Sequence, residues 1–199
     1  MTDAQTLAVY EQAAEDYARG FARTKDTDQR ADRERFLALV PDGGRILDYG
    51  CGPGHWAADF AAAGYQAEAS DATPAMARLA LDRYGLHVRI EPFEALDAEN
   101  VYDGIWANFS LLHSPRADLP GHLARIRKAL KPKGALMLGM KLGTGEARDR
   151  LGRFYTYYTE DELRARLNEA GFTVLSARRG NGAGLAGAEE TFVTLTAHA

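Results

Sequence analysis

The stretch that decides the fold is I-L-D-Y-G-C-G-P-G-H-W, residues 46–56. A short apolar run leads into three glycines at alternate positions, and an Ala-rich helical segment follows them. The order strand, glycine loop, helix directs backbone N–H groups and a helix N-terminus toward a ligand. In an open α/β sheet, ligands bind at the carboxyl ends of the strands. The stretch therefore predicts a ligand site, although a plain tight turn would also use these glycines.

Residues in and beside the loop narrow the choice of ligand. A P-loop requires Gly-Lys-Ser/Thr after the glycines, whereas this chain has Gly54, His55 and Trp56. A dinucleotide-binding loop requires a third glycine at the first helical turn, and His55 occupies that position. Asp48 precedes the loop, where a negative charge would repel phosphates and would suit a cationic or amine-bearing ligand.

A second carboxylate indicates that the expected ligand contains a sugar. Asp71 ends the next predicted strand, about 20 residues after Gly50, which is where a carboxylate binds ribose hydroxyls. Aspartates also favour turns on their own account, so a local role for Asp48 and Asp71 stays open. A ligand with a ribose, an amine and no phosphate is expected, and S-adenosylmethionine has all three properties.

Strand-like and helical segments alternate from residue 45 onward. Strands are expected at 45–49, 65–70, 87–91, 101–108, 135–140, 172–177 and 191–197, with helices between most of them. This alternation predicts an α/β fold with a doubly wound, mostly parallel seven-stranded sheet. Residues 1–40 form a helical N-terminal lid and residues 45–199 the α/β core of a single domain. The Gly/Ala-rich residues 180–187 are expected to be a connection between the last two strands.

Composition excludes several classes of protein. The formal net charge is −4 and the pI is about 5.8, which argues against a nucleic-acid partner. The single cysteine, Cys51, allows neither an intrachain disulfide nor a cysteine-based metal site, and no metal is expected. No signal peptide and no apolar run long enough to span a bilayer is visible, so a cytoplasmic protein without a membrane partner is expected.

Four stretches in order resemble the class I S-adenosylmethionine-dependent methyltransferase family. They are I-L-D-Y-G-C-G-P-G, the strand end at Asp71, Y-D-G-I-W-A-N-F-S-L-L-H at 102–113, and A-L-K-P-K-G-A-L-M at 129–137. The N-terminal tyrosines and G-R-F-Y-T-Y-Y-T-E-D-E-L at 152–163 are similar to a small bacterial subgroup that acts on small molecules, some of whose members are labelled tellurite-resistance-like. The resemblance spans residues 10–175 and implies a Rossmann-like methyltransferase fold.

The resemblance also implies roles for individual residues. Gly50 and Gly52 would let the backbone approach the methionine part of the cofactor, Asp48 would hold its ammonium, and Asp71 would bind the ribose. The adenine motif of the family, roughly G-D-A-E-D-L, reads E-P-F-E-A-L at 91–96, with a proline at the usual aspartate. The other implied cofactor residues are Phe93 (through its backbone N–H) and Glu94 in that motif, Tyr17 and Arg23 at the cofactor carboxylate, Ala72 and Met76 at the adenine, and Asn108 and Phe109 beside the methionine.

The acceptor side of the site is less constrained. Methyl transfer from a sulfonium is an in-line displacement that relies on positioning, so no catalytic residue is implied. Candidate substrate residues are Tyr10, His113, Lys141, Arg153 and Tyr157, and the two cations among them suggest an anionic small molecule. Tyr10 and His113 are equally compatible with core packing, and Tyr157 with packing of the lid.

Three other functions remain open at this point. An RNA or protein methyltransferase is disfavoured by the acidic pI, and no Asn/Asp-Pro-Pro-Tyr motif of amino-methylating enzymes follows the fourth strand. A protein that binds S-adenosylmethionine without transferring its methyl group is possible, because fold does not imply function. An NAD-dependent oxidoreductase is the last alternative. The sequence is compatible with a monomer or a homodimer.

Overall fold

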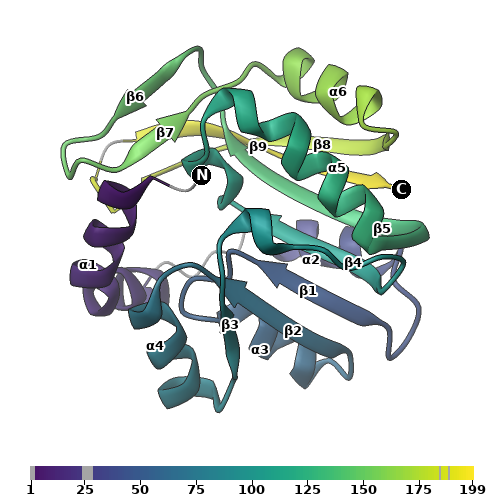
Figure 1. The fold of residues 1–199 in the computed structure, drawn as a ribbon, viewed down its shortest axis with the longest axis horizontal. Helices are drawn as coiled ribbons and strands as arrows, with labels where there is room; N and C mark the ends of the chain where they lie inside the picture. Colours follow the sequence, from purple (N-terminus) through teal and green to yellow (C-terminus); the bar gives the residue numbers. More distant parts are fainter. Residues whose placement is uncertain (1–2, 24–28, 184, 188) are drawn as a thin grey trace.

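The glycine loop follows Arg45–Tyr49, an interior strand of a seven-stranded sheet, in the computed structural model, which describes residues 3–23, 29–183, 185–187 and 189–199 (Figure 1). The strand order is β3-β2-β1-β4-β5-β9-β8. The first five strands run parallel, whereas β9 is antiparallel to both of its neighbours. The strands are β1 Arg45–Tyr49, β2 Gln66–Asp71, β3 Val88–Ile90, β4 Tyr102–Asn108, β5 Leu130–Lys141, β8 Thr173–Ala183 and β9 Glu189–His198.

Helices connect the parallel strands, as the alternating pattern predicted. Three short 3-10 turns lie beside them: η1 Phe93–Ala95, η2 Leu111–His113 and η3 Arg116–Asp118. The predicted capping box of α6 is confirmed, because Thr159 and Glu162 each accept a backbone N–H from the other. The α-helices are α1 Ala4–Arg23, α2 Gln29–Leu37, α3 His55–Ala62, α4 Pro74–Tyr84, α5 Leu119–Ala129 and α6 Glu160–Glu169.

Two features of the last third of the chain differ from the sequence-based expectation. Strand β8 extends through Gly180 to Ala183 and pairs with β9 as far as Glu189, so the first half of the expected connection belongs to a long hairpin strand. A separate two-stranded hairpin, β6 Glu146–Arg148 with β7 Phe154–Thr156, was not predicted. Its strands have three residues each, which is too short for a period of two to be visible in the sequence.

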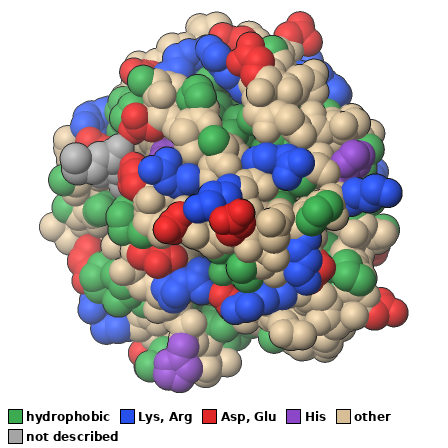
Figure 2. All heavy atoms as spheres, turned by 45° about the vertical axis from the view of Figure 1, so that its right-hand side comes forward, with side chains coloured by type: hydrophobic (Ala, Val, Ile, Leu, Met, Phe, Trp, Pro, Cys, Tyr) green, Lys and Arg blue, Asp and Glu red, His purple; other side chains and the backbone are tan. Residues whose placement is uncertain are grey.

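Charged side chains of both signs lie close together on the molecular surface. On the face shown in Figure 2, Lys and Arg side chains are interspersed with Asp and Glu side chains. Many charged side chains of the protein form ion pairs, for example Lys131 with Asp103 at 2.9 Å and Lys128 with Asp97 at 2.7 Å. Within the described part of the chain, no helix is both long and apolar enough to cross a bilayer.

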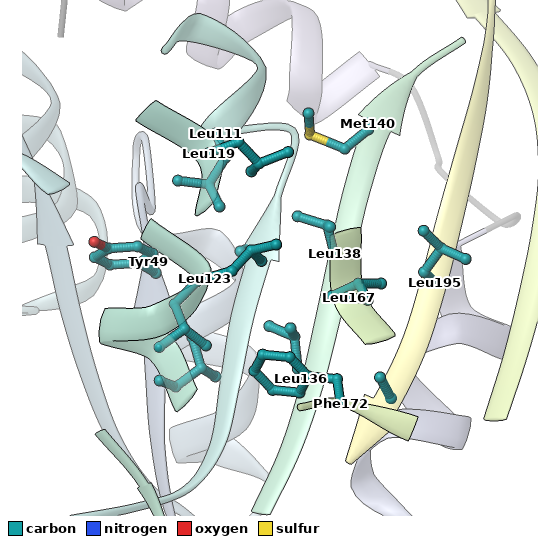
Figure 3. Packing of buried hydrophobic residues seen from close by; sticks show 14 of the residues in the cluster. Tyr49, Leu111, Leu119, Leu123, Leu136, Leu138, Met140, Leu167, Phe172 and Leu195 are labelled. Atoms are coloured by element: carbon teal, nitrogen blue, oxygen red, sulfur yellow. The ribbon is translucent and has the colours of Figure 1, made fainter. Parts of the chain in front are cut away.

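The sheet is buried on both faces, and successive residues of its central strands serve opposite layers. Leu136 and Leu138 of β5 pack with α5 and α6, whereas Met137 faces the other way, toward Phe36 of α2 and Phe60 of α3. Figure 3 shows the first of these layers, between β4, β5 and β9 and the two helices. This two-sided burial explains the continuous apolar run of β5. It also fixes the carboxyl ends of β1, β2 and β4 at one edge of the sheet.

Candidate functional site

The three glycines after β1 adopt a conformation that side chains disfavour. Gly50, Gly52 and Gly54 have φ values of +76°, +54° and +82°. A Cβ on Gly50 would lie 2.3 Å from Cβ of Ser110, so a side chain cannot fit there. A Cβ on Gly54 would lie 2.9 Å from Cβ of Ala80 in α4. The loop is therefore a close approach of backbone to its neighbours as well as a turn.

A pocket lies over this loop, at the carboxyl ends of β1, β2 and β4. Helix α1 contributes its outer wall, and η1 and η2 close its sides. The lining residues are Thr6, Leu7, Tyr10, Asp48, Gly50, Cys51, Gly52, Pro53, His55, Trp56, Asp71, Ala72, Thr73, Met76, Phe93, Asn108, Phe109, Ser110 and His113. Nine of the cofactor residues expected from the resemblance are in this set, as are the acceptor candidates Tyr10 and His113.

Asp48 is a buried carboxylate at the floor of the pocket. Its side chain is 2% exposed, and Oδ2 accepts a hydrogen bond of 3.1 Å from the Ala57 N–H in the first turn of α3. Burial raises the pKa of Asp48 to about 8, and the negative charge of Asp71 adds to the increase. Asp48 thus caps α3 and also presents a carboxyl group whose ionised form requires a nearby cation.

Asp71 is held at the end of β2 by two backbone donors. Its Oδ2 accepts from the Gly52 N–H at 2.8 Å, and its Oδ1 accepts from the Thr73 N–H at 2.8 Å. Burial raises the pKa of Asp71, while these two hydrogen bonds oppose the increase. Each carboxylate oxygen has a second lone pair, so the half-buried side chain can accept two further donors from the pocket.

A chain of hydrogen bonds joins α1 to η2 and β7 on the far side of the pocket. His113 Nδ1 lies 2.7 Å from the Phe154 carbonyl oxygen, so this nitrogen is the donor and Nε2 is the acceptor. The Tyr10 hydroxyl lies 2.8 Å from Nε2 and donates to it. Arg153 Nη1 donates to the same hydroxyl at 2.9 Å, and Asp149 fixes the guanidinium at 2.7–2.9 Å.

The electrostatics of this chain favour neutral rings. Burial lowers the pKa of His113 to about 3, and the positive charges of Arg153 and Lys141 lower it further, against a hydrogen bond to the Phe154 carbonyl. Burial raises the pKa of Tyr10, although the charge of Arg153 opposes this. His113 is consequently a weak base, and the Tyr10–His113 pair is better suited to positioning than to proton abstraction.

Three of the expected acceptor residues do not line the pocket: Lys141, Arg153 and Tyr157. Arg153 is 2% exposed and is neutralised by Asp149. Lys141 forms an ion pair with Glu190, and its Nζ lies 3.6 Å from the centre of the Tyr155 ring. The Tyr157 hydroxyl donates to Glu190 at 3.3 Å. Asp149 is close to Arg153 in sequence, whereas Glu190 is brought beside Lys141 by the fold.

Glu94 also lies outside the pocket lining, so its expected contact with the adenine is not supported by its position. Its carboxylate faces Asp118 and His122, and one donor atom from each of these three residues lies within 4.8 Å of the others. The neighbouring Phe93 does line the pocket, and its carbonyl accepts a 2.6 Å hydrogen bond from the Tyr49 hydroxyl. The backbone of α1 includes Tyr17 and Arg23, but their side chains lie outside the described residues.

Several pocket residues were missed by the sequence analysis. Thr6 and Leu7 lie one helical turn before Tyr10 and share its face, which a helical projection of the lid would have indicated. Ser110 follows β4 and donates to the Tyr49 carbonyl at 2.7 Å while packing on Gly50. Trp56 carries no sequence signal, because its place in the pocket depends on how α3 is seated on the sheet.

Comparisons with known proteins agree with this geometry. The family model described as "Methyltransferase domain" matches residues 21–177. No curated protein matches the sequence at a significant level. Among solved structures, 1,6-didemethyltoxoflavin-N1-methyltransferase from Burkholderia thailandensis is similar, with 28% identity and a TM-score of 0.74 over 96% of this chain and 87% of that one. That protein was crystallised with 1,6-didemethyltoxoflavin and S-adenosylhomocysteine.

Two further structures show the same fold at lower identity. An S-adenosylmethionine-dependent methyltransferase from Methanosarcina mazei is 19% identical with a TM-score of 0.71, covering 81% of this chain and 95% of that one. Phosphoethanolamine N-methyltransferase 2 from Haemonchus contortus, crystallised with S-adenosylmethionine, is 16% identical with a TM-score of 0.74 over 94% of this chain and 57% of that one. The matched family model covers most of the chain, and on this basis the chain belongs to the methyltransferase-domain family.

Proposed function

We propose that this protein is an S-adenosylmethionine-dependent methyltransferase whose acceptor is a small, flat, largely neutral molecule. The observation that carries the proposal is the convergence of Asp48, Gly50 and Asp71 on one pocket that also contains Tyr10 and His113. The pocket residues fit the cofactor: a cationic ammonium would satisfy Asp48, and a ribose would supply the two donors that Asp71 can still accept. Gly50 provides the close backbone approach.

The acceptor class follows from what surrounds the far end of the pocket. Tyr10, Phe109 and His113 present aromatic faces, and the Tyr10 and His113 rings meet edge to face at 5.3 Å. Flat aromatic molecules pack favourably on such rings. The two nearby cations, Lys141 and Arg153, are engaged by carboxylates, so the structure offers an anionic acceptor little compensation for desolvation. The similarity to a methyltransferase crystallised with a fused heteroaromatic substrate supports the same class.

The chain's own contribution to transfer is then positioning. When bound, S-adenosylmethionine supplies an electrophilic methyl group. The hydrogen-bonded chain Asp149–Arg153–Tyr10–His113 holds the phenol and imidazole rigid, so they can orient the acceptor and exclude water. Because His113 is a weak base, an acceptor that is already nucleophilic at neutral pH, such as a ring nitrogen or an amine, fits better than an alcohol.

Cofactor choice is tested by isothermal titration calorimetry with S-adenosylmethionine, S-adenosylhomocysteine and NAD. We expect both sulfur compounds to bind and NAD not to bind. Asp71→Asn should weaken cofactor binding by about tenfold or more, because the lost charge-assisted hydrogen bonds are worth about 1.5–3 kcal/mol. Asp82→Asn, on the exposed face of α4, is the matched control and should bind normally. Preference for NAD would overturn the proposed function.

The acceptor class is tested separately with methyl-labelled S-adenosylmethionine and a fractionated cell extract. Label in a small heteroaromatic product is the expected result. Label in RNA or protein fractions would favour the macromolecular alternative, whose sensitivity to nuclease or protease identifies it. Tight cofactor binding with no labelled product in any fraction would favour a binding protein without transfer activity.

A further inference from the structure

The three residues Glu94, Asp118 and His122 form a cluster outside the pocket, which the proposed function does not use. Glu94 lies in η1, Asp118 is the last residue of η3, and His122 is in the first turn of α5. One donor atom from each residue lies within 4.8 Å of the other two. Residues four apart on a helix share a face, so the chain places Asp118 and His122 on the same side of α5.

His122 is the observation that points to a ligand. Its side chain is 1% exposed, and within the described part of the chain neither ring nitrogen has a hydrogen-bond partner. Leaving a buried donor or acceptor unsatisfied is energetically costly. The ring packs edge to face on Phe93, with the ring centroids 5.6 Å apart, and this contact supplies no hydrogen bond. The imidazole is thus buried beside two carboxylates, and its own two nitrogens are available to a ligand.

The nearby Arg125 side chain is bonded to backbone carbonyls of this region. Arg125, one turn further along α5, donates from Nε to the Glu94 carbonyl at 3.1 Å and from Nη1 to the Gly121 carbonyl at 3.3 Å. These bonds fasten η1 to α5 through the backbone. They hold the Glu94 carboxylate on the side of α5 where Asp118 and His122 lie.

We propose that Glu94, Asp118 and His122 bind a divalent transition-metal ion, with zinc the best match and nickel or cobalt as substitutes. One imidazole and two carboxylates are donors that such ions accept, at about 2.0–2.2 Å from the metal. Donors on a tetrahedral ion lie about 3.4 Å apart, so small side-chain rotations from the observed separation close the site around one ion. Water would complete the coordination.

The position of the site gives it a structural role next to the pocket. Phe93, which lines the pocket, packs directly against His122, and Glu94 is its neighbour in sequence. A metal held by η1 and α5 would fix the turn that carries Phe93. This role is independent of the methyl-transfer step, so the metal site and the proposed function stand or fall separately.

The test is calorimetric titration of the tag-free protein with Zn²⁺ and Ni²⁺. We expect one ion per chain in the wild type. His122→Phe, which keeps a buried ring, and Glu94→Gln should each weaken binding by at least about tenfold, since each removes one of three protein ligands. His87→Gln removes an exposed histidine and Cys51→Ser removes the thiol, and both should bind metal as the wild type does.

A second readout covers the case in which His122→Phe does not fold. Paramagnetic Ni²⁺ should broaden amide NMR signals of η1 and the start of α5 in the wild type, and Glu94→Gln should abolish this effect. Absence of one-to-one binding by the wild type would overturn the proposal. Unchanged affinity in folded Glu94→Gln and His122→Phe, or broadening centred on Cys51 or His87, would overturn it equally.

Discussion

At the scale of single residues, Asp48 couples the pocket to pH. In the unbound protein, burial raises its pKa to about 8, so the carboxyl group is protonated near neutral pH. A cofactor ammonium beside it would favour the ionised form. We therefore expect S-adenosylmethionine binding at about pH 6.5 to release nearly one proton, and the affinity to rise with pH up to about 8. Calorimetry in buffers of different ionisation enthalpy measures the released protons.

Asp48→Asn is the matched variant, because its amide oxygen can still accept the Ala57 N–H that caps α3. It should release no proton and should bind cofactor with little pH dependence. The unbound proteins give an independent control. Between about pH 4 and 8 native Asp48 keeps a proton that the unfolded chain has lost, so the free energy of unfolding falls as pH rises. That slope should be shallower in Asp48→Asn, and equal slopes would contradict the assigned pKa.

The sequence predicted pocket residues best where their role depends on local spacing. Asp48 and Asp71 were found because each follows a strand at a fixed distance from the glycines, and the structure brings both to one pocket. Arg153 and Lys141, expected near the acceptor, lie outside the pocket lining and form ion pairs with Asp149 and with Glu190 of β9. Asp149 lies four residues from Arg153, whereas Glu190 comes beside Lys141 only when β5 and β9 are assembled in the sheet.

At the scale of secondary-structure elements, α1 forms the outer wall of the pocket. It contributes Tyr10 to the lining and is fastened to α4 by Glu11. Glu11 Oε2 accepts the Ala75 N–H at 2.8 Å, and Oε1 accepts from Arg78 at 2.5 Å. The carboxylate therefore caps the N-terminus of α4, where a negative charge is favourable. This contact joins the lid helix α1 to α4 beside the pocket.

Removing this contact should loosen the lid while leaving the fold intact. We expect Glu11→Ala to increase hydrogen exchange across the first turns of α1 and to speed cofactor dissociation by about three- to tenfold, because a cap of this kind is worth about 0.5–2 kcal/mol. Gln12→Ala, at the adjacent exposed position, is the control and should match the wild type in both measurements. Normal exchange and dissociation in Glu11→Ala would show that other contacts hold the lid.

The elements also mark the limit of pattern-based prediction. Five parallel strands, the capping box of α6 and the helical start at Pro74 were all visible, because each has a period or a cap of its own. The hairpin β6–β7 was not visible, since its strands are short and one of them is fully exposed. Its position depends on Arg148, which pairs with Asp3 of the lid at 2.7 Å.

At the scale of the whole molecule, the C-terminal strand holds the sheet together. β9 lies between β5 and β8, so the last strand in sequence is inserted inside the sheet and not added at its edge. Leu195 of β9 is fully buried among residues of β5, α5 and α6 (Figure 3). If the described chain unfolds as one domain, a destabilising substitution at this position lowers the stability of the whole core.

Leu195→Ala tests this cooperativity. The cavity left by the side chain should lower the free energy of unfolding by about 2–5 kcal/mol. Because β9 connects β8 and α6 to the parallel strands, the loss should shift one transition and create no second one. Glu189→Ala, at the exposed start of the same strand, should change stability by less than about 0.5 kcal/mol.

Urea unfolding followed by far-ultraviolet circular dichroism and by tryptophan fluorescence compares the two parts of the fold, since Trp56 and Trp106 pack on the layer opposite Leu195. Coincident transitions from both probes are the expected result, and separated transitions would divide the chain into two folding units.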